Sequence, residues 1–307
     1  MGLGIARDRI IFANACKRPS DIRHAAANGI PLTTFDSVCE LEKMARWNPN
    51  TTALLRIRAD DPEARCQLGN KYGCETYEVR PLLEAAVRLG VTVVGVSFHV
   101  GSGATNPVAF SEAIAAARDA WNVATELGFS MRVLDIGGGF AAGDGLVNVA
   151  KAVNAALSRY FGDASDIRVI AEPGRYFAES VATYHTMVFG VRERPGDDGT
   201  ATREYWVTDG LYGSMNSVLY DHATLSCRVL KNAATESSVG DVVSSTVFGP
   251  TCDGLDTLLR DVELPAMGVG DWLAWPAMGA YTQVGACDFN GIVSTARPVF
   301  YVVSGVV

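Results

Sequence analysis

The sequence lacks the features that mark several large classes of protein. Its seven cysteines are odd in number and never form a Cys-x-x-Cys pair, and its four histidines show no metal-ligand spacing. A disulfide framework and a zinc site are therefore not expected, and a reducing compartment is favoured. The N-terminus MGLGIARDRIIF has no long apolar run and reads as neither a signal peptide nor a membrane anchor. We expect a cytoplasmic protein.

Basic charge is also scarce. The chain carries 26 lysines and arginines against 34 acidic residues, a formal net charge of -8, and it has no long basic run. This balance argues against a nucleic-acid-binding surface. The 307 residues, 48% of them hydrophobic, suit one large or two medium soluble domains with a substantial core.

Short β-branched runs alternate with helical stretches through the first half of the chain. Strands are predicted over 9–13, 31–35, 53–58, 93–99, 132–136 and 168–172, and helices over 20–28, 37–46, 77–89, 107–127 and 147–161. Gly29, Gly90 and Gly128 stand where a helix ends in the left-handed conformation. Ser37 followed by Glu40 predicts a capping box.

This alternation predicts parallel strands joined by right-handed crossovers. Six strands suit a doubly wound sheet, whereas an eight-stranded barrel needs two more, which would precede Met1. Polar and glycine residues follow the strands, namely Asp36, His99, 137–139 and Glu172. A barrel places its active site at that edge, so we predict an incomplete (β/α)8 barrel of the TIM type over residues 1–176.

The sequence pattern changes after about residue 177. Alternating or β-rich runs occupy 181–191, 204–208, 242–248 and 298–303, separated by turn clusters such as 195–199. Residues 177–307 are therefore predicted to form an antiparallel β domain.

Two motifs in the first half could bind the phosphate and the ring nitrogen of a pyridine cofactor. Gly137–Gly139 directly follow a predicted strand and can wrap a phosphate with backbone N–H groups, although a tight strand-to-helix turn is the alternative. Glu172 ends the next strand and could pair with a protonated ring nitrogen, with Arg175 serving a phosphate or carboxylate. A mutual Glu172–Arg175 ion pair is the alternative.

Two further motifs are less specific. His99, followed by Gly-Ser-Gly, could lie flat on an aromatic cofactor, or it could be a core histidine. Cys252 and Asp253 share a glycine-containing loop and could combine a proton donor with an ammonium-binding carboxylate. A turn with an incidental thiol is the alternative. Tyr220, Asp221 and Tyr281 stand near predicted turns.

Together these segments resemble the eukaryotic-type ornithine decarboxylases, members of the alanine-racemase-like class of pyridoxal-phosphate enzymes. The motifs SFHVGSG, DIGGGF, AEPGRY, DGLYGSMN, LYDH, GPTCDGLD and MGAYT occur in this order, and the resemblance runs from 9 to 305. It implies a barrel followed by a β domain, in a head-to-tail homodimer with shared active sites. The implied reaction is decarboxylation of L-ornithine to putrescine and carbon dioxide.

The resemblance also implies roles for individual residues. His99 would stack on the ring of pyridoxal phosphate, Glu172 would keep the ring nitrogen protonated, and the phosphate would be held by Ser102, Gly137, Gly138, Gly139, Gly174, Arg175 and Tyr281. In the partner subunit, Cys252 would protonate the carbon from which carbon dioxide leaves. The substrate would be positioned by Tyr220, Asp221, Asp253 and Phe289. The Cys-Asp pair favours a basic amino acid, since relatives acting on diaminopimelate have Cys-Glu-Ser there.

Two departures from the family pattern stand out. Family members carry a cofactor-binding lysine in the first barrel strand, in a segment like Tyr-Ala-Val-Lys, and none of the five lysines here matches it. Gln67 stands where the animal enzymes have an arginine. We therefore expect little turnover from residues 1–307 alone. The alternatives are a non-catalytic paralogue resembling antizyme inhibitors, an antizyme-type regulator as partner, or a decarboxylase of lysine or another basic amino acid.

Overall fold

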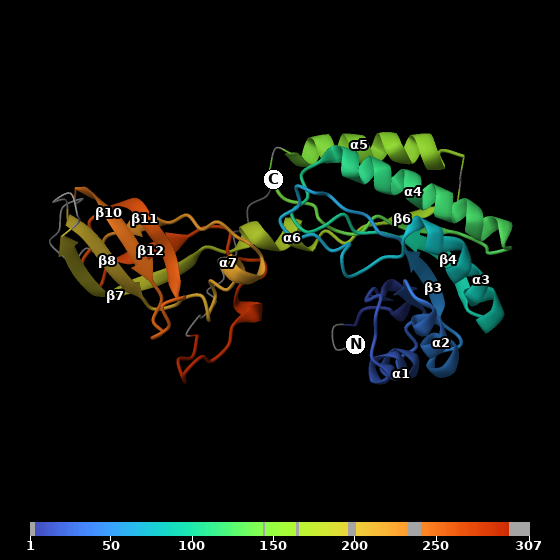
Figure 1. Ribbon diagram of the computed structural model, residues 1–307, viewed down its shortest axis with the longest axis horizontal. Helices are drawn as coiled ribbons and strands as arrows, with labels where there is room; N and C mark the ends of the chain where they lie inside the picture. Colours follow the sequence, from blue (N-terminus) through green and yellow to red (C-terminus); the bar gives the residue numbers. More distant parts are fainter. Residues whose placement is uncertain (1–3, 144, 164–165, 196–200, 233–240, 295–307) are drawn as a thin grey trace. The chain divides into compact units, whose positions relative to one another are not determined.

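The computed structural model describes residues 4–143, 145–163, 166–195, 201–232 and 241–294. Contacts within the chain divide it into two compact units, Met1–Tyr176 and Phe177–Val307 (Figure 1). The first unit contains parallel strands and long helices, and the second contains a separate sheet. Each unit has its own hydrophobic core.

The first unit is built on six parallel strands. They are β1 (Ile11–Phe12), β2 (Leu32–Phe35), β3 (Thr52–Arg56), β4 (Thr92–Ser97), β5 (Val133–Asp135) and β6 (Arg168–Ile170). Their order in the sheet is their order in the chain, and each pairs in parallel with the next. A doubly wound sheet reverses direction at a switch point, whereas a barrel does not. The predicted barrel class is thereby confirmed over the doubly wound alternative.

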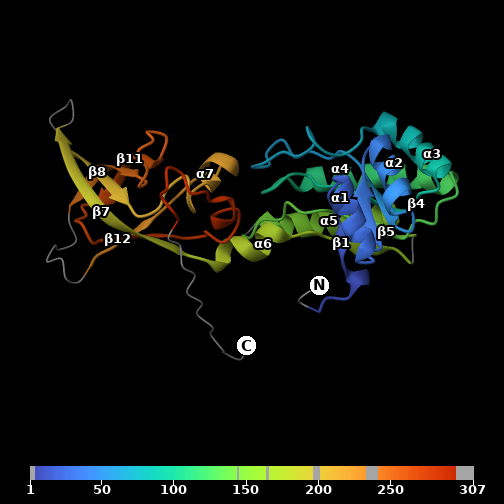
Figure 2. The same ribbon diagram turned by 90° about the horizontal axis from the view of Figure 1, so that it is seen from below.

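Helices follow the strands as the sequence predicted. They are α1 (Pro19–Ala27), α2 (Val38–Trp47), α3 (Val79–Leu89), α4 (Pro107–Glu126) and α5 (Gly145–Phe161), with the shorter α6 (Gly174–Ala178), η1 (Arg7–Arg9) and η2 (Thr76–Glu78) (Figures 1 and 2). Gly29, Gly90 and Gly128 have φ values of 64°, 67° and 90°, which confirms the predicted left-handed positions after three helices.

Successive side chains of the strands pack on opposite faces of the sheet. Leu55, Val93 and Leu134 belong to the large core that the helices cover. Leu54, Val94 and Val133 form a separate small cluster. This alternation follows from the two-residue period of a strand and gives the sheet two buried faces, as a barrel wall has.

The predicted capping box at α2 is only half formed. The hydroxyl of Ser37 accepts a hydrogen bond from the Glu40 N–H at 3.4 Å, but the Glu40 carboxylate does not return to Ser37. It lies instead 2.9 Å from the ammonium group of Lys17 and pairs with Lys43. Lys17 and Glu40 are almost fully buried. Leaving either charge unpaired would therefore cost more free energy than losing the second hydrogen bond of the capping box.

The second unit contains a six-stranded sheet. Its strands are β7 (Tyr184–Pro195), β8 (Ala201–Val207), β9 (Arg228–Leu230), β10 (Val242–Phe248), β11 (Thr257–Pro265) and β12 (Trp272–Trp275), in the order β11-β10-β8-β7-β12-β9. The short helices η3 (Glu179–Val181), α7 (Ser217–Tyr220) and η4 (Gln283–Gly285) lie outside the sheet. The strand predicted at 298–303 falls outside the described residues.

The pairing in this sheet departs from the prediction at one place. Four of its neighbouring pairs are antiparallel, but β8 and β10 are parallel. A parallel pair requires a crossover rather than a hairpin, and in the chain α7 and β9 lie between these two strands. The sequence pattern does not reveal this, because alternation is the same in parallel and antiparallel strands with one solvated face.

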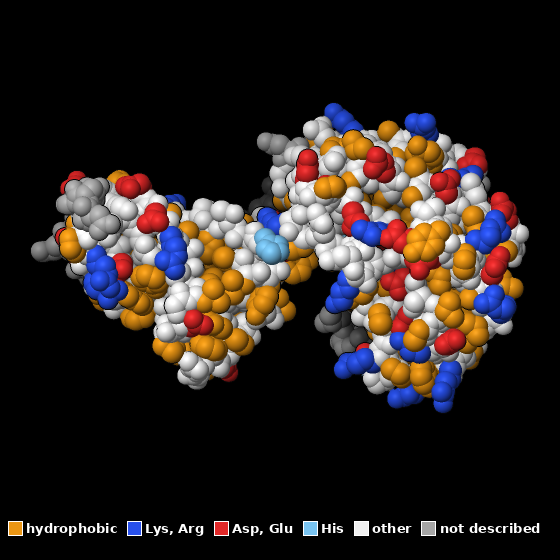
Figure 3. Space-filling model, viewed as in Figure 1, with side chains coloured by type: hydrophobic (Ala, Val, Ile, Leu, Met, Phe, Trp, Pro, Cys, Tyr) orange, Lys and Arg blue, Asp and Glu red, His pale blue; other side chains and the backbone are white. Residues whose placement is uncertain are grey.

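The surface agrees with the charge balance of the sequence. On the face seen in Figure 3, acidic and basic side chains are interspersed over both units. None of the helices in the described ranges is long and apolar enough to span a membrane. Within those same ranges, no three histidine, cysteine or acidic side chains gather as a metal site requires.

Candidate functional site

Three of the predicted motifs meet at the carboxyl ends of neighbouring strands in the first unit. His99 follows β4, Gly137–Gly139 follow β5 and Glu172 follows β6. The Glu172 N–H donates to the Gly137 carbonyl at 2.7 Å. A Cβ atom added at Gly138 would lie 2.6 Å from the carbonyl oxygen of Glu172 and 2.8 Å from Nε2 of His99. Gly138 is therefore the point at which the three motifs converge.

The glycines are required by this close approach. Gly137 and Gly139 have φ values of 64° and 100°, which side-chain-bearing residues rarely adopt. A Cβ atom at either would lie within 2.3 Å of a carbonyl oxygen, that of Phe98 or Gly101. The N–H groups of Gly138 and Gly139 donate to no group in the described part of the chain. Two backbone donors thus remain for a ligand, as a phosphate-binding loop requires.

His99 is held as a neutral ring. Its Nδ1 accepts a hydrogen bond from the Gly101 N–H at 3.1 Å, so the ring proton is assigned to Nε2. Burial, with a smaller contribution from the charge of Arg56, lowers the pKa of His99 to about 4. At neutral pH the imidazole therefore carries no charge, and its flat face suits stacking on an aromatic ring.

Glu172 belongs to a charged cluster that the sequence motifs did not reveal. Burial and the neighbouring Glu172 carboxylate raise the pKa of Asp135 to about 7. Burial lowers the pKa of Arg56, while the charges of Glu172 and Asp36 act in the opposite direction. Arg56 ends β3 and Asp135 ends β5. Ionisable residues at the carboxyl ends of apolar strands are the signal that could have identified both.

Glu172 itself is exposed. The strand before it, β6, also has exposed residues at Arg168 and Val169. In the described sheet β6 is an edge strand that pairs only with β5. Solvent therefore reaches the Glu172 carboxylate in this structure.

A cationic side chain, that of Arg175, lies beside the glycine loop. The Arg175 side chain, 3% exposed, donates to the Ser102 hydroxyl from Nε at 3.2 Å and from Nη2 at 2.9 Å. The segment carrying Ser102 is tied to the loop because the Ala104 N–H donates to the Gly139 carbonyl at 3.0 Å. Gly174 begins α6, and its N–H donates to the Glu172 carbonyl at 2.8 Å. Gln67 donates its amide to the Pro62 carbonyl.

The second unit brings together three more of the predicted residues. Cys252 and Asp253 lie in the loop between β10 and β11. The hydroxyl of Tyr212 donates to one oxygen of Asp253, and the Leu255 N–H donates to the other at 3.0 Å. The rings of Tyr212 and Phe289 stack with centroids 3.9 Å apart and planes 9° from parallel. Tyr212 is a further member of this cluster that the motifs did not identify.

The other predicted residues of the second unit occupy different segments. Tyr220 ends α7 and is 72% exposed, whereas the adjacent Asp221 is buried. Tyr281 lies just before η4, is 49% exposed, and has a positive φ of 56°. The structure thus places the hydroxyl-bearing tyrosines at the surface and Asp221 in the interior.

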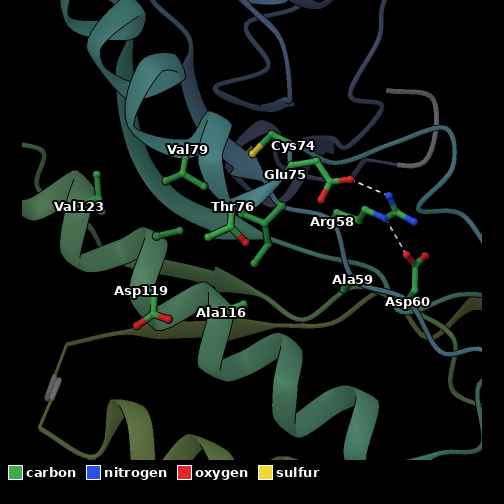
Figure 4. A pocket seen from close by; sticks show the side chains of 12 residues that line it. Arg58, Ala59, Asp60, Cys74, Glu75, Thr76, Val79, Ala116, Asp119 and Val123 are labelled. Carbon is green, nitrogen blue, oxygen red and sulfur yellow. Dashed lines mark hydrogen bonds and ion pairs between the residues drawn. The ribbon is translucent and has the colours of Figure 1, made fainter.

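The first unit also contains a separate cavity. It measures about 220 Å³ and is lined by the residues after β3, the start of α3 and one side of α4 (Figure 4). Arg58 bridges Asp60 at 2.7 Å and Glu75 at 2.6 Å at its edge. None of the predicted site residues lines it. We therefore place the candidate site at the strand ends rather than in this cavity.

Comparison with known proteins identifies the family. Residues 1–179 match the family described as pyridoxal-dependent decarboxylase, pyridoxal binding domain. The chain is 49% identical over 302 residues to the chloroplastic ornithine decarboxylase of Nicotiana glauca, covering 96% of this chain and 69% of that protein. It is 43% identical over 317 residues to the ornithine decarboxylase of Mus musculus, covering 99% of this chain and 68% of that protein.

Solved structures agree with these sequence matches. The arginine decarboxylase of Paramecium bursaria Chlorella virus, bound to agmatine, superposes with a TM-score of 0.88 at 38% identity, over 95% of this chain and 77% of that one. The lysine/ornithine decarboxylase of Vibrio vulnificus, complexed with putrescine, gives 0.83 at 31% identity, over 95% and 76%. Fold, sequence and the convergence at Gly138 lead to one conclusion: the chain belongs to the pyridoxal-dependent decarboxylases.

Proposed function

We propose that this protein decarboxylates L-ornithine to putrescine and carbon dioxide with pyridoxal phosphate as its cofactor. The observation that carries the proposal is the convergence of His99, Gly138 and Glu172 at one edge of the sheet. The names of the curated relatives support ornithine as the substrate. Lysine or another basic amino acid is the alternative, because the solved relatives include decarboxylases of lysine and arginine.

The residues present fit the cofactor. The N–H groups of Gly138 and Gly139 would bind the phosphate, with the Ser102 hydroxyl and the Arg175 guanidinium beside them. Gly137 and Gly174 would shape this loop, and Tyr281 would add a hydroxyl. When bound, pyridoxal phosphate supplies a pyridine ring that accepts the electrons released as carbon dioxide leaves.

Glu172 and His99 would contact different parts of the pyridine ring. Burial and the neighbouring Glu172 carboxylate raise the pKa of Asp135 to about 7, so Asp135 is partly protonated at neutral pH and repels the Glu172 carboxylate less than a fully ionised aspartate would. An anionic Glu172 would hold a proton on the ring nitrogen, and Arg56 balances the charge of the cluster. The neutral ring of His99 would cover one ring face and exclude water.

The residues of the second unit would act on the substrate. Cys252 would deliver a proton to the carbon that loses carbon dioxide. Asp253, with Tyr220 and Asp221, would face the distal ammonium group, and Phe289 would line the aliphatic part of the pocket. We propose that these residues come from the partner subunit of a homodimer, so activity per chain should fall on dilution below the dimer dissociation constant.

Steady-state kinetics of the full-length protein test the proposal. Ornithine should have a higher specificity constant than lysine or arginine, and Glu172→Gln should lower kcat by roughly 100-fold, since it removes a charge that acts only on the reacting ring. The double change Asp119→Asn, Glu75→Gln at the separate cavity should leave kcat unaltered. A higher specificity constant for lysine would replace the proposed substrate, and an unchanged kcat in Glu172→Gln would remove the proposed role of this residue.

The lysine that holds the cofactor requires its own test. Lys17 is buried against Glu40 and the Thr34 carbonyl, and Lys231 pairs with Asp271, so neither side chain is available. We propose that a polypeptide of residues 1–307 alone has little turnover and that borohydride fixes no cofactor on its five lysines. Fixation on any of them, found by peptide mapping, contradicts this. A protein that lacks turnover in every form tested supports the alternative of a regulatory paralogue resembling antizyme inhibitors.

A further inference from the structure

Tyr212 lies at the junction of three loops in the second unit. Its hydroxyl donates to Asp253 in the loop after β10, and its ring stacks on Phe289. Its carbonyl accepts a hydrogen bond from the Cys287 N–H at 2.9 Å. Backbone, ring and hydroxyl are thus each fixed by a different contact, and all three contacts involve the loops that carry the proposed substrate-binding residues.

A second set of bonds fixes the two loops relative to each other. Asp256, 1% exposed, accepts the Leu211 N–H on one oxygen at 2.7 Å and the Thr251 N–H and hydroxyl on the other at 3.0 and 2.7 Å. Leu211 precedes Tyr212, and Thr251 precedes Cys252. The distance between the Tyr212 backbone and the Cys252–Asp253 pair is therefore set by a buried carboxylate and not by Tyr212 itself.

The Tyr212 hydroxyl decides how the Asp253 carboxylate is turned. One Asp253 oxygen is bonded to the Leu255 N–H, and the Tyr212 hydroxyl fixes the other. Each carboxylate oxygen accepts more than one hydrogen bond, so both still have lone pairs for an ammonium group. The hydrogen bond to Asp253 raises the pKa of Tyr212 to about 12, so its hydroxyl remains a donor over the working pH range.

We propose that Tyr212 is a positioning residue that makes the site selective for substrates with a distal ammonium group, by holding the Asp253 carboxylate toward it. The inference rests on the proposed function, in which Asp253 faces that group. It adds a determinant of substrate specificity outside the Cys-Asp motif. Tyr212 touches no reacting atom, so its loss should weaken recognition of the substrate and leave the chemical step intact.

The substitution Tyr212→Phe tests this with little disturbance, because it keeps the ring stacked on Phe289 and removes only the hydroxyl. KM for ornithine should rise roughly 10- to 100-fold, the range for losing a hydrogen bond that orients a charged group, with kcat nearly unchanged. The acid limb of the kcat/KM profile should move to higher pH, because the Tyr212 hydrogen bond is one cause of the lowered pKa of Asp253.

Two inhibitors of equal chain length give the sharper readout. The inhibition constant of 1,4-diaminobutane should rise in Tyr212→Phe by the same factor as KM, whereas that of 1-aminobutane, which lacks the distal amine, should not change. Tyr184→Phe is the matched control, since the Tyr184 hydroxyl donates to Asp209 at 2.6 Å in the same unit. It removes an equivalent tyrosine–aspartate bond and should leave both inhibition constants unaltered.

The outcomes separate this inference from the proposed function. If Tyr212→Phe weakens both amines equally, or neither, Tyr212 has no role in selectivity and the inference is wrong. If the wild-type protein does not decarboxylate ornithine, the proposed function fails. Calorimetric binding of the two amines to wild-type and Tyr212→Phe proteins then still decides whether Tyr212 selects for a distal ammonium group.

Discussion

Replacing His99 by glutamine should remove much of the acid sensitivity of the first unit. Burial holds the folded-state pKa of His99 at about 4, against an ordinary value of 6.5. Between these two pH values the unfolded chain binds a proton on this ring and the folded chain does not. Proton uptake therefore favours unfolding as the pH falls.

The size of the effect follows from the two pKa values. They correspond to about 3 kcal/mol of stability, fully present above pH 6.5 and lost as the pH falls toward 4. His99→Gln has no proton to bind, so its stability should fall by about 3 kcal/mol less over the same interval. The comparison uses only the change in unfolding free energy with pH, so a different stability of the variant at pH 7.5 does not affect it.

Urea unfolding between pH 4 and 7.5 measures the difference. Because the two units can unfold separately, unfolding of the first should be followed by hydrogen exchange of peptides from β4 and α4. The variant His24→Gln is the control, since His24 is exposed at the end of α1 and its replacement should reproduce the wild-type profile. If the stability of wild type and of His99→Gln fell by the same amount between pH 7.5 and 4, the assignment of a neutral ring at His99 would be refuted.

Three further changes test the cofactor site and the buried Lys17–Glu40 ion pair of the first unit. Gly138→Ala should abolish binding of pyridoxal phosphate, measured by absorbance titration, because the added Cβ would lie 2.6 Å from the Glu172 carbonyl oxygen; Gly145→Ala, where no atom lies within 4 Å, should bind normally. Arg175→Ala should weaken pyridoxal phosphate roughly 10- to 100-fold and leave pyridoxal unaffected, and equal weakening of both ligands would contradict a phosphate contact. Lys17→Met should cost about 3–5 kcal/mol in urea unfolding, because it leaves the Glu40 carboxylate buried with only Lys43 beside it. A loss under 1 kcal/mol would show that Glu40 is not buried as described.

Much of the first unit follows from local sequence. Strands and helices were predicted because alternation, helix-ending glycines and apolar runs are local signals. The grouping of His99, Gly137–Gly139 and Glu172 followed from topology, since the carboxyl ends of parallel strands share one edge. No role was predicted for Arg56 and Asp135, because each falls inside a predicted strand, 53–58 or 132–136, although the structure places both at strand ends.

The second unit was predicted less completely. The parallel pairing of β8 with β10 depends on contacts between residues about 40 positions apart, which no local pattern encodes. The same applies to Tyr212, whose partners Asp253 and Phe289 lie in distant segments. Its motif, Asp-Gly-Leu-Tyr-Gly, gave no indication of which groups would meet its ring and hydroxyl. Side-chain pairs of this kind can be identified only when the fold is known.

A crystal structure of the protein with pyridoxal phosphate tests the central claim most directly. The phosphate should lie within hydrogen-bonding distance of the Gly138 and Gly139 N–H groups and of Ser102 and Arg175, with the ring nitrogen at Glu172 and the ring face on His99. Cofactor density in the cavity beside Arg58 and Glu75, or a ring nitrogen far from Glu172, would contradict the assignment of this site.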